Sequence, residues 1–167
     1  MAGVVQGTRV VGIDLGERRI GVSVSDSRRV LATPHSVIAR SGDRDTDHRA
    51  IAAVVSEFGA GLVVVGLPLT LAGDRGPAAS AAVAEASALR TELNVPVVLH
   101  DERLTTVEAD RRRRLGPEPG AGGGERSRSK VRMTRPGPAS RERRLGIDAV
   151  AATVLLQSWL DQNRGTS

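Results

Sequence analysis

Residues 9–25 read RVVGIDLGERRIGVSVS, two apolar stretches joined by a short polar turn. The first stretch, residues 9–13, predicts a buried strand that ends at Asp14. The second, residues 20–25, alternates large apolar with small residues and predicts a second strand. Because the connection is so short, the two strands should pair antiparallel. The chain therefore begins a sheet with a hairpin that carries an acidic residue at the end of its first strand.

The next segments extend this sheet and add helices. Residues 30–38 predict a third strand, in which Pro34 indicates an edge position or a break. Farther on, apolar residues at helical spacing alternate with short apolar runs that are typical of buried strands. The expected elements are a helix at about 51–58, a strand at 62–65, a helix at 77–93, a strand at 95–99, a helix at 105–115 and a final helix at about 143–161.

This order of elements predicts the fold class. Three antiparallel strands followed by two strand–helix units indicate an α/β fold with a five-stranded mixed sheet and helices on both faces. Right-handed crossovers would place the fourth and fifth strands parallel to the first, on its far side from the second. The carboxyl ends of these three strands then meet at one edge, where open parallel sheets carry their sites. The length of 167 residues indicates a single domain, 1–167.

Basic residues are concentrated in one segment. Residues 111–144 hold twelve Lys and Arg against three Glu, a net charge of 12 − 3 = +9, which leaves 5 − 9 = −4 for the remainder. Such asymmetry indicates a polyanionic partner, most simply nucleic acid. The alternative is a general preference of this sequence for Arg, Ala and Gly. Within this segment, residues at about 116–140 are rich in Gly, Pro and Arg and predict a flexible loop.

Composition also excludes several classes of protein. The chain has no Cys, which rules out a disulfide framework and a thiolate metal site. No apolar run approaches the roughly 20 residues that span a bilayer, and the first residues lack the layout of a signal peptide. We therefore expect a soluble, cytoplasmic protein without membrane contact.

Acidic residues lie at three places far apart in the chain, each where an apolar stretch meets a turn or a helix start. They are Asp14, the pair Asp101 and Glu102, and Asp148. A carboxylate next to a buried stretch is costly to desolvate unless a cation pairs with it. Three carboxylates that converge on one edge of the sheet could hold a pair of divalent ions for phosphodiester hydrolysis. Oxygen ligands favour Mg²⁺ or Mn²⁺.

Each acid also has a simpler explanation. Asp14, flanked by Gly12 and Gly16 that permit close backbone approach, could cap a turn at the end of a strand. Asp101 and Glu102 could be first-turn charges of the following helix. Asp148 is expected to face the sheet, and its partner could be a metal or an Arg. The neighbours that would share this inward side are Ala151, Ala152 and Leu155, while Ile147, Val150, Val154 and Trp159 form a further apolar side of the helix.

Other polar residues near the same edge could contact phosphate. Arg75 follows the fourth strand and could approach a phosphate group. Thr105 and Thr106 could bind phosphate through their hydroxyls and the amides of a helix start, although capping of the helix explains them equally well.

Four motifs together resemble one known family. They are Gly12-Ile13-Asp14-Leu15-Gly16, Val64-Val65-Gly66-Leu67-Pro68-Leu69, Asp101-Glu102-Arg103-Leu104-Thr105-Thr106, and Ile147-Asp148 followed by an Ala-rich helix. In this order and at this spacing they resemble the YqgF family of pre-16S rRNA nucleases, also described as Holliday-junction-resolvase-like. The resemblance implies a ribonuclease H-like fold. It also implies a metal-dependent nuclease in 5′-end maturation of small-subunit ribosomal RNA, with Asp14, Glu102 and Asp148 as its acidic triad.

The resemblance gives the leading hypothesis, a Mg²⁺-dependent nuclease that acts on structured precursor rRNA as a monomer or homodimer. A Holliday-junction resolvase is an alternative, but such resolvases carry a further Asp one turn after the last acid, where this chain has Ala151. A non-catalytic nucleic-acid-binding module is another alternative, and an actin-like ATPase is a distant one because the chain is too short for two such domains. In the leading hypothesis the basic loop contacts phosphates through Arg126, Arg128, Lys130 and Arg132.

Overall fold

The structure is a computed structural model that describes residues 8–69, 73–101 and 138–164. Its strands are β1 (Arg9–Leu15), β2 (Arg19–Ser25), β3 (Ala32–Ala39), β4 (Ala60–Leu67) and β5 (Val97–Asp101). Its helices are α1 (Arg44–Glu57), α2 (Pro77–Glu92) and α4 (Pro138–Asn163). The expected helix at 105–115 and most of the expected flexible loop at 116–140 lie outside the described residues.

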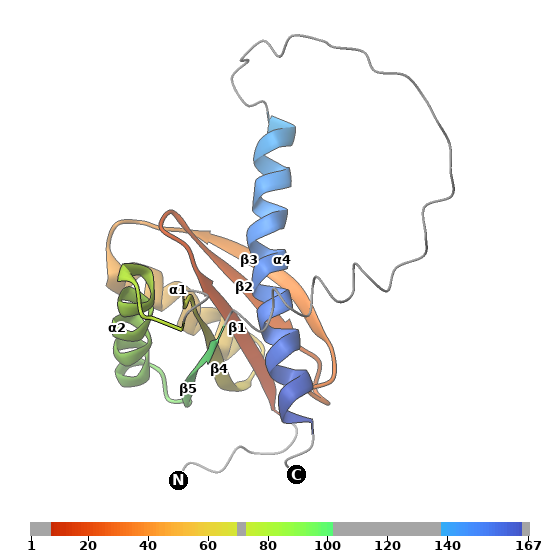
Figure 1. The fold of residues 1–167 in the computed structure, drawn as a ribbon. Helices are drawn as coiled ribbons and strands as arrows, with labels where there is room; N and C mark the ends of the chain where they lie inside the picture. The colour runs from red at the N-terminus through yellow and green to blue at the C-terminus, as the bar shows by residue number, and fades with distance from the viewer. Residues whose placement is uncertain (1–7, 70–72, 102–137, 165–167) are drawn as a thin grey trace, which may run out of the picture.

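The five strands form one mixed sheet in the order β3-β2-β1-β4-β5. β1 pairs antiparallel with β2, and β2 with β3, whereas β4 is parallel to both β1 and β5. This arrangement, which Figure 1 shows from the side, confirms the predicted α/β fold and its strand order. Pro34 lies in β3 at the edge of the sheet, where a residue without a backbone amide is best tolerated, and the register with β2 shifts beside it.

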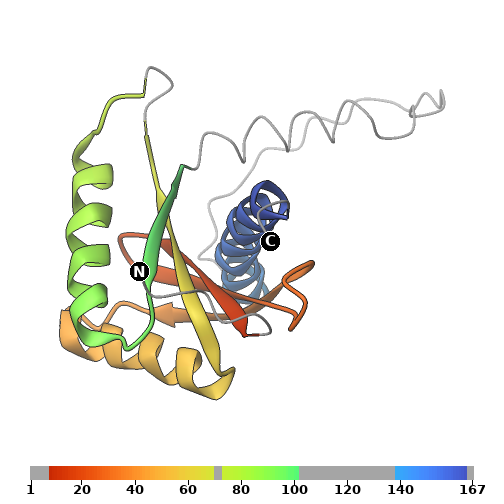
Figure 2. The same cartoon turned by 90° about the horizontal axis from the view of Figure 1, so that it is seen from below.

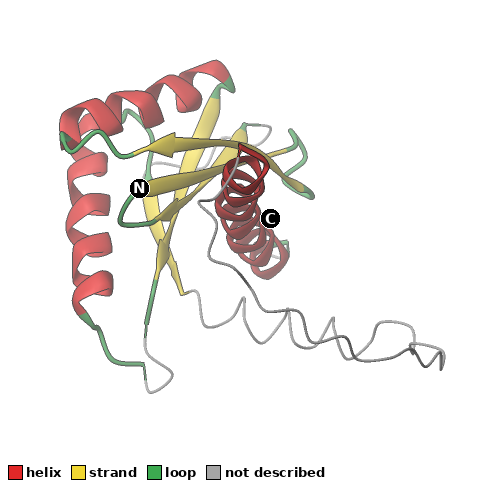
Figure 3. Ribbon diagram, turned by 90° about the horizontal axis from the view of Figure 1, so that it is seen from above, coloured by secondary structure: helices red, strands yellow, loops and turns green. Residues whose placement is uncertain are grey.

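Helices cover both faces of the sheet. Figures 2 and 3 show α1 and α2 on one side of the strands and α4 on the other. Residues of β1 alternate between the two layers, as expected for a strand buried on both sides. Val11 and Ile13 pack toward α1 and α2, while Val10 packs toward Leu156 and Leu160 of α4.

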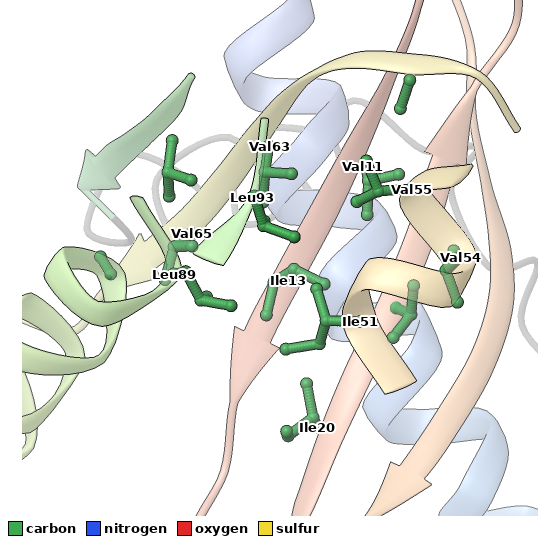
Figure 4. Packing of buried hydrophobic residues seen from close by; sticks show 14 of the residues in the cluster. Val11, Ile13, Ile20, Ile51, Val54, Val55, Val63, Val65, Leu89 and Leu93 are labelled. Carbon is green, nitrogen blue, oxygen red and sulfur yellow. The ribbon is translucent and has the colours of Figure 1, made fainter. Parts of the chain in front are cut away.

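The larger core lies between the sheet and the two helices α1 and α2. Ile13, Ile51 and Leu89 are fully buried there, and Figure 4 shows them meeting from three elements. Each such side chain stabilises the fold by about 1.5–3 kcal/mol relative to an exposed one. This core fixes β1 and, with it, the position of Asp14 at the end of the strand.

Helix α4 differs from the sequence prediction in two respects. It begins at Pro138 rather than near 143, so the end of the expected loop is helical; proline suits a first helical turn because its missing amide would have no partner there. The apolar side with Val150 and Val154 faces outward, the two side chains being 53% and 40% exposed, and Ala151 is exposed as well. The buried side comprises Ala149, Ala152, Leu155, Leu156 and Leu160.

Within the residues that the structure describes, none of the helices is both long and apolar enough to cross a membrane.

Candidate active site

Asp14 lies near the end of β1 on the face that α4 covers. Strand alternation puts it on the same side as Gly12, whose backbone approaches Leu156 of α4. The carboxylate is partly buried. Burial raises the pKa of Asp14, and the negative charge of Asp148 raises it further. Asp14 is therefore an acid whose ionised form is disfavoured unless a cation approaches.

Asp148 comes to this place from the far end of the chain. It lies on α4 one turn before Ala152, which is fully buried against the sheet. Its backbone lies against Gly21, the strand partner of Asp14, and its charge acts on Asp14, so two of the three predicted acids are neighbours in the folded chain. Two carboxylates that share a site repel each other, which makes their surroundings attractive to cations.

Among the described residues, Arg19 brings a positive charge to this pair. Nη1 of Arg19 donates to Oδ2 of Asp148 at 3.3 Å, and the two side chains are 34% and 35% exposed. The arginine that sequence reasoning left open as a partner for Asp148 is thus present. Sequence reasoning did not identify Arg19 itself, which it assigned to the turn. The usable signal was alternation, since Arg19 and Gly21 lie on one face of β2.

The turn between β1 and β2 is fixed from the outside by Arg40. The amide of Gly16 donates to the carbonyl of Arg19 at 2.9 Å, which closes the turn. Arg40, after β3, donates from Nε to the carbonyl of Gly16 at 3.1 Å. Its other two nitrogens bind Glu85 of α2 at 2.7 and 3.0 Å. This bidentate pair links α2 to the turn that carries Arg19 toward Asp148.

Several predicted site residues remain untested by the geometry. Glu102, the third acid, follows the last described residue of β5. His100, two residues earlier, is buried on the α4 side and lies 3.2 Å from the hydroxyl of Ser158. Among the described residues, no group of three His, Cys, Asp or Glu is placed to hold a metal ion. Also outside the described residues are Thr105, Thr106, Arg126, Arg128, Lys130 and Arg132.

Arg75 is described and exposed, in the segment that leads into α2. Its role as a phosphate contact stays a prediction.

The raised pKa of Asp14 predicts that this acid destabilises the metal-free protein at neutral pH. The folded chain binds the proton of Asp14 more tightly than the unfolded chain does. This tighter proton binding stabilises the folded chain fully at pH values below the pKa of Asp14 in the unfolded chain. The stabilisation is lost as the pH rises through the pKa of Asp14 in the folded chain. Asp14→Asn should thus increase the free energy of unfolding at pH 7. Urea denaturation in a chelator, from about pH 4 to pH 8, should show the difference growing with pH. A variant less stable than the parent at pH 7 would contradict this.

If Asp148 holds the divalent ion of the nuclease that the resemblance implies, Arg19 should compete with that ion. An exposed ion pair contributes about 0.2–1 kcal/mol, so Arg19→Gln should lower the Mg²⁺ concentration for half-maximal cleavage roughly 1.5- to 5-fold. A Mg²⁺ titration of the cleavage rate measures this. Arg18→Gln, a change of an exposed neighbour in the same turn, is the matched control. A higher Mg²⁺ requirement in Arg19→Gln would show that Arg19 supports the cation site instead.

Comparison with known proteins identifies the class. RuvC of Thermus thermophilus, solved in complex with a Holliday junction substrate, matches 95% of this chain and 97% of its own with a TM-score of 0.53 and 18% identity. A relative from Leifsonia xyli is 42% identical over 157 residues, 94% of this chain and 88% of the relative. One from Roseiflexus is 37% identical and is covered over 96% of its length. Both relatives carry the name "Putative pre-16S rRNA nuclease".

The chain is therefore a nuclease, a hydrolase of phosphodiester bonds, on a ribonuclease H-like fold. The family model described as RuvX: Holliday junction resolvase matches residues 8–120, and the chain belongs to this family. The resemblance to the YqgF family is confirmed.

Proposed function

We propose that this chain is a metal-dependent nuclease that matures the 5′ end of pre-16S ribosomal RNA in the cytoplasm. The observation that carries the proposal is the position of Asp148 against Gly21, the strand partner of Asp14, which brings two carboxylates together at the end of β1. In this proposal Asp14, Glu102 and Asp148 hold Mg²⁺ or Mn²⁺. The names of the relatives, which share about two fifths of their residues with this chain, support precursor rRNA as the substrate.

The residues present suit a divalent cation. Asp14 is held partly buried beside a second carboxylate, and in the part of the chain that the structure describes the partly exposed guanidinium of Arg19 pairs with Asp148. A bound divalent ion would supply a water-derived nucleophile at neutral pH and stabilise the leaving oxygen. His100 of β5 faces α4. Glu102 comes two residues later, so strand alternation would place it on the α4 side of the sheet, where Asp14 lies.

The protein's own residues position the substrate and the acids. Arg40 and Glu85 keep the β1–β2 turn rigid, so that Asp14 and Arg19 hold their places. Arg75, Thr105 and Thr106 would contact substrate phosphates near the acids. Arg126, Arg128, Lys130 and Arg132 would add a salt-dependent grip on structured RNA without reading its sequence.

A Holliday-junction resolvase is the second candidate, favoured by the printed description of the family and by the RuvC-like fold. Ala151 argues against it, because this position of α4 is exposed and carries no carboxylate. A resolvase also cuts two opposed strands and so works as a symmetric dimer. The proposed rRNA nuclease can act as a monomer or a homodimer.

One experiment separates the candidates. Purified protein is incubated with precursor 16S rRNA and with a four-way DNA junction, each with Mg²⁺, Mn²⁺ or a chelator. We expect metal-dependent cleavage of the RNA and little cleavage of the junction. Preferential junction cleavage by a stable dimer would favour the resolvase. Absence of Mg²⁺ or Mn²⁺ binding at millimolar concentrations, with RNA binding retained, would favour a non-catalytic module.

A further inference from the structure

Gly21 is the residue of β2 that lies directly beside Asp14, as its partner in the antiparallel register of the hairpin. It has no side chain, and the backbone of α4 fills the place where one would stand. A β-carbon built on Gly21 would lie 2.1 Å from the carbonyl oxygen of Asp148 and 2.8 Å from its carbonyl carbon. The main chain of Asp148 therefore rests on the strand position adjacent to Asp14.

A second glycine continues this contact along the helix. A β-carbon on Gly12 would lie 2.7 Å from Cβ of Leu156 and 3.2 Å from the carbonyl oxygen of Ala152. Ser23, the register partner of Gly12, donates from its hydroxyl to the carbonyl of Ala152 at 2.8 Å. Asp148, Ala152 and Leu156 are spaced by four residues, so they lie on one side of α4 in successive turns. This side of the helix lies against the two glycines.

The two glycines differ in what a side chain would displace. At Gly12 the nearest atom is the hydroxyl of Ser23, which can rotate, at 2.5 Å. At Gly21 the nearest atoms are the backbone of the acidic residue itself. To reach even 3.0 Å, the carbonyl of Asp148 would have to move by 3.0 − 2.1 = 0.9 Å. A change at Gly21 therefore moves one of the two acids directly.

We propose that Gly21 is a positioning residue of the active site, which sets the distance between Asp148 and Asp14 by admitting the backbone of α4 onto β2. This inference rests on the proposed metal-dependent function and names the feature of the fold that assembles its acidic pair. Metal–ligand distances tolerate only about 0.2 Å. A displacement of nearly 1 Å in one ligand is thus enough to weaken a shared cation site.

The test compares Gly21→Ala with Gly146→Ala in the full chain. Gly146 lies on α4 two residues before Asp148, and a β-carbon there meets no atom of the described residues within 4 Å, so it is a matched glycine-to-alanine control. Mn²⁺ binding is measured by calorimetry, and kcat and KM are measured on RNA. Gly21→Ala should weaken Mn²⁺ binding about tenfold or more and lower kcat about 100-fold. KM should change little, and Gly146→Ala should match the parent.

Two further variants separate displacement from mere loss of stability. Ser23→Ala removes the hydrogen bond to Ala152 but adds no bulk, so it should lower Tm while leaving Mn²⁺ affinity within about twofold. Asp148→Glu in the Gly21→Ala background carries a longer side chain and should restore part of the lost Mn²⁺ affinity. A folded Gly21→Ala with the affinity and kcat of the parent would overturn the proposal. So would Mn²⁺ binding in Ser23→Ala as weak as in Gly21→Ala.

Failure of the proposed function gives a different pattern. If the parent binds no Mn²⁺, the metal hypothesis fails, and crystal structures of Gly21→Ala and Gly146→Ala then decide the inference. Asp148 must lie farther from Asp14 in Gly21→Ala alone, and an unmoved Asp148 overturns the proposal. If Gly21→Ala does not fold, a crystal structure of the parent protein with Mn²⁺ decides. Asp148 should bind the ion while its carbonyl still rests on Gly21, and an ion held by Asp148 with α4 lifted away from Gly21 overturns the proposal.

Discussion

Asp14→Asn is expected to lower the rate of metal-dependent cleavage by about 10³-fold or more. Residues that only hydrogen-bond to a metal ligand typically cost about 10- to 100-fold when they are changed, and loss of a ligand itself should cost more. The amide keeps the shape of the side chain but removes the charge that would bind the ion. Its position in β1 is fixed by a core on both faces of the strand, so the fold does not depend on this carboxylate. RNA binding should persist, since it is expected to depend on the basic segment.

The measurement is single-turnover cleavage of precursor RNA at saturating Mg²⁺, with RNA affinity measured separately. Asp45→Asn is the control, because Asp45 is an exposed carboxylate in the first turn of α1, on the opposite face of the sheet. The control should cleave like the parent. Cleavage by pure Asp14→Asn protein at the parent rate would remove the proposed mechanism.

The strand order was predictable because the signals for it are local. The apolar run that precedes Asp14 and the short turn after it specify an antiparallel hairpin, and crossover handedness then places β4 beside β1. The side of the sheet on which Asp14 lies also follows from alternation. Gly12 was correctly recognised as a point of close backbone approach, since α4 packs directly on it.

The orientation of α4 was harder to predict because the helix has apolar residues on several sides. Periodicity indicates a helix but does not decide which apolar side is buried when more than one exists. Val150 and Val154 are larger than Ala149 and Ala152, yet the alanines are inside. The reason is the close approach at Gly21, which admits a small residue such as Ala152 and leaves no room for a branched one.

Arg19 was missed for a related reason. In the sequence it belongs to a polar turn, where a charged side chain is ordinarily solvated. Only the pairing of β1 with β2 and the placement of α4 bring it to Asp148, from which it is separated by most of the chain. An ion pair between such distant segments has no local signal, whereas the three acids could be proposed as site residues because each adjoins an apolar stretch.

Asp148→Asn is expected to lower kcat by about 10²- to 10³-fold, the loss found when one charge-stabilising group is removed from an active site. We expect a smaller loss than for Asp14→Asn, because Asp148 lies at the exposed margin and already shares its charge with Arg19. Asp161→Asn on the same helix is the control and should cleave like the parent. Metal-free Asp148→Asn should also show a lower pKa for Asp14, because one cause that raises it is gone while burial remains.

The double variant Asp14→Asn/Asp148→Asn tests whether the two acids act as one unit. Ligands of a shared cation are not additive, because loss of the first already removes the ion that the second would hold. The double variant should therefore cleave no more slowly than Asp14→Asn alone. If the two losses instead multiply, the acids contribute independently. The carboxylate of Asp148 would then serve to hold Arg19 at 3.3 Å rather than to bind a shared cation.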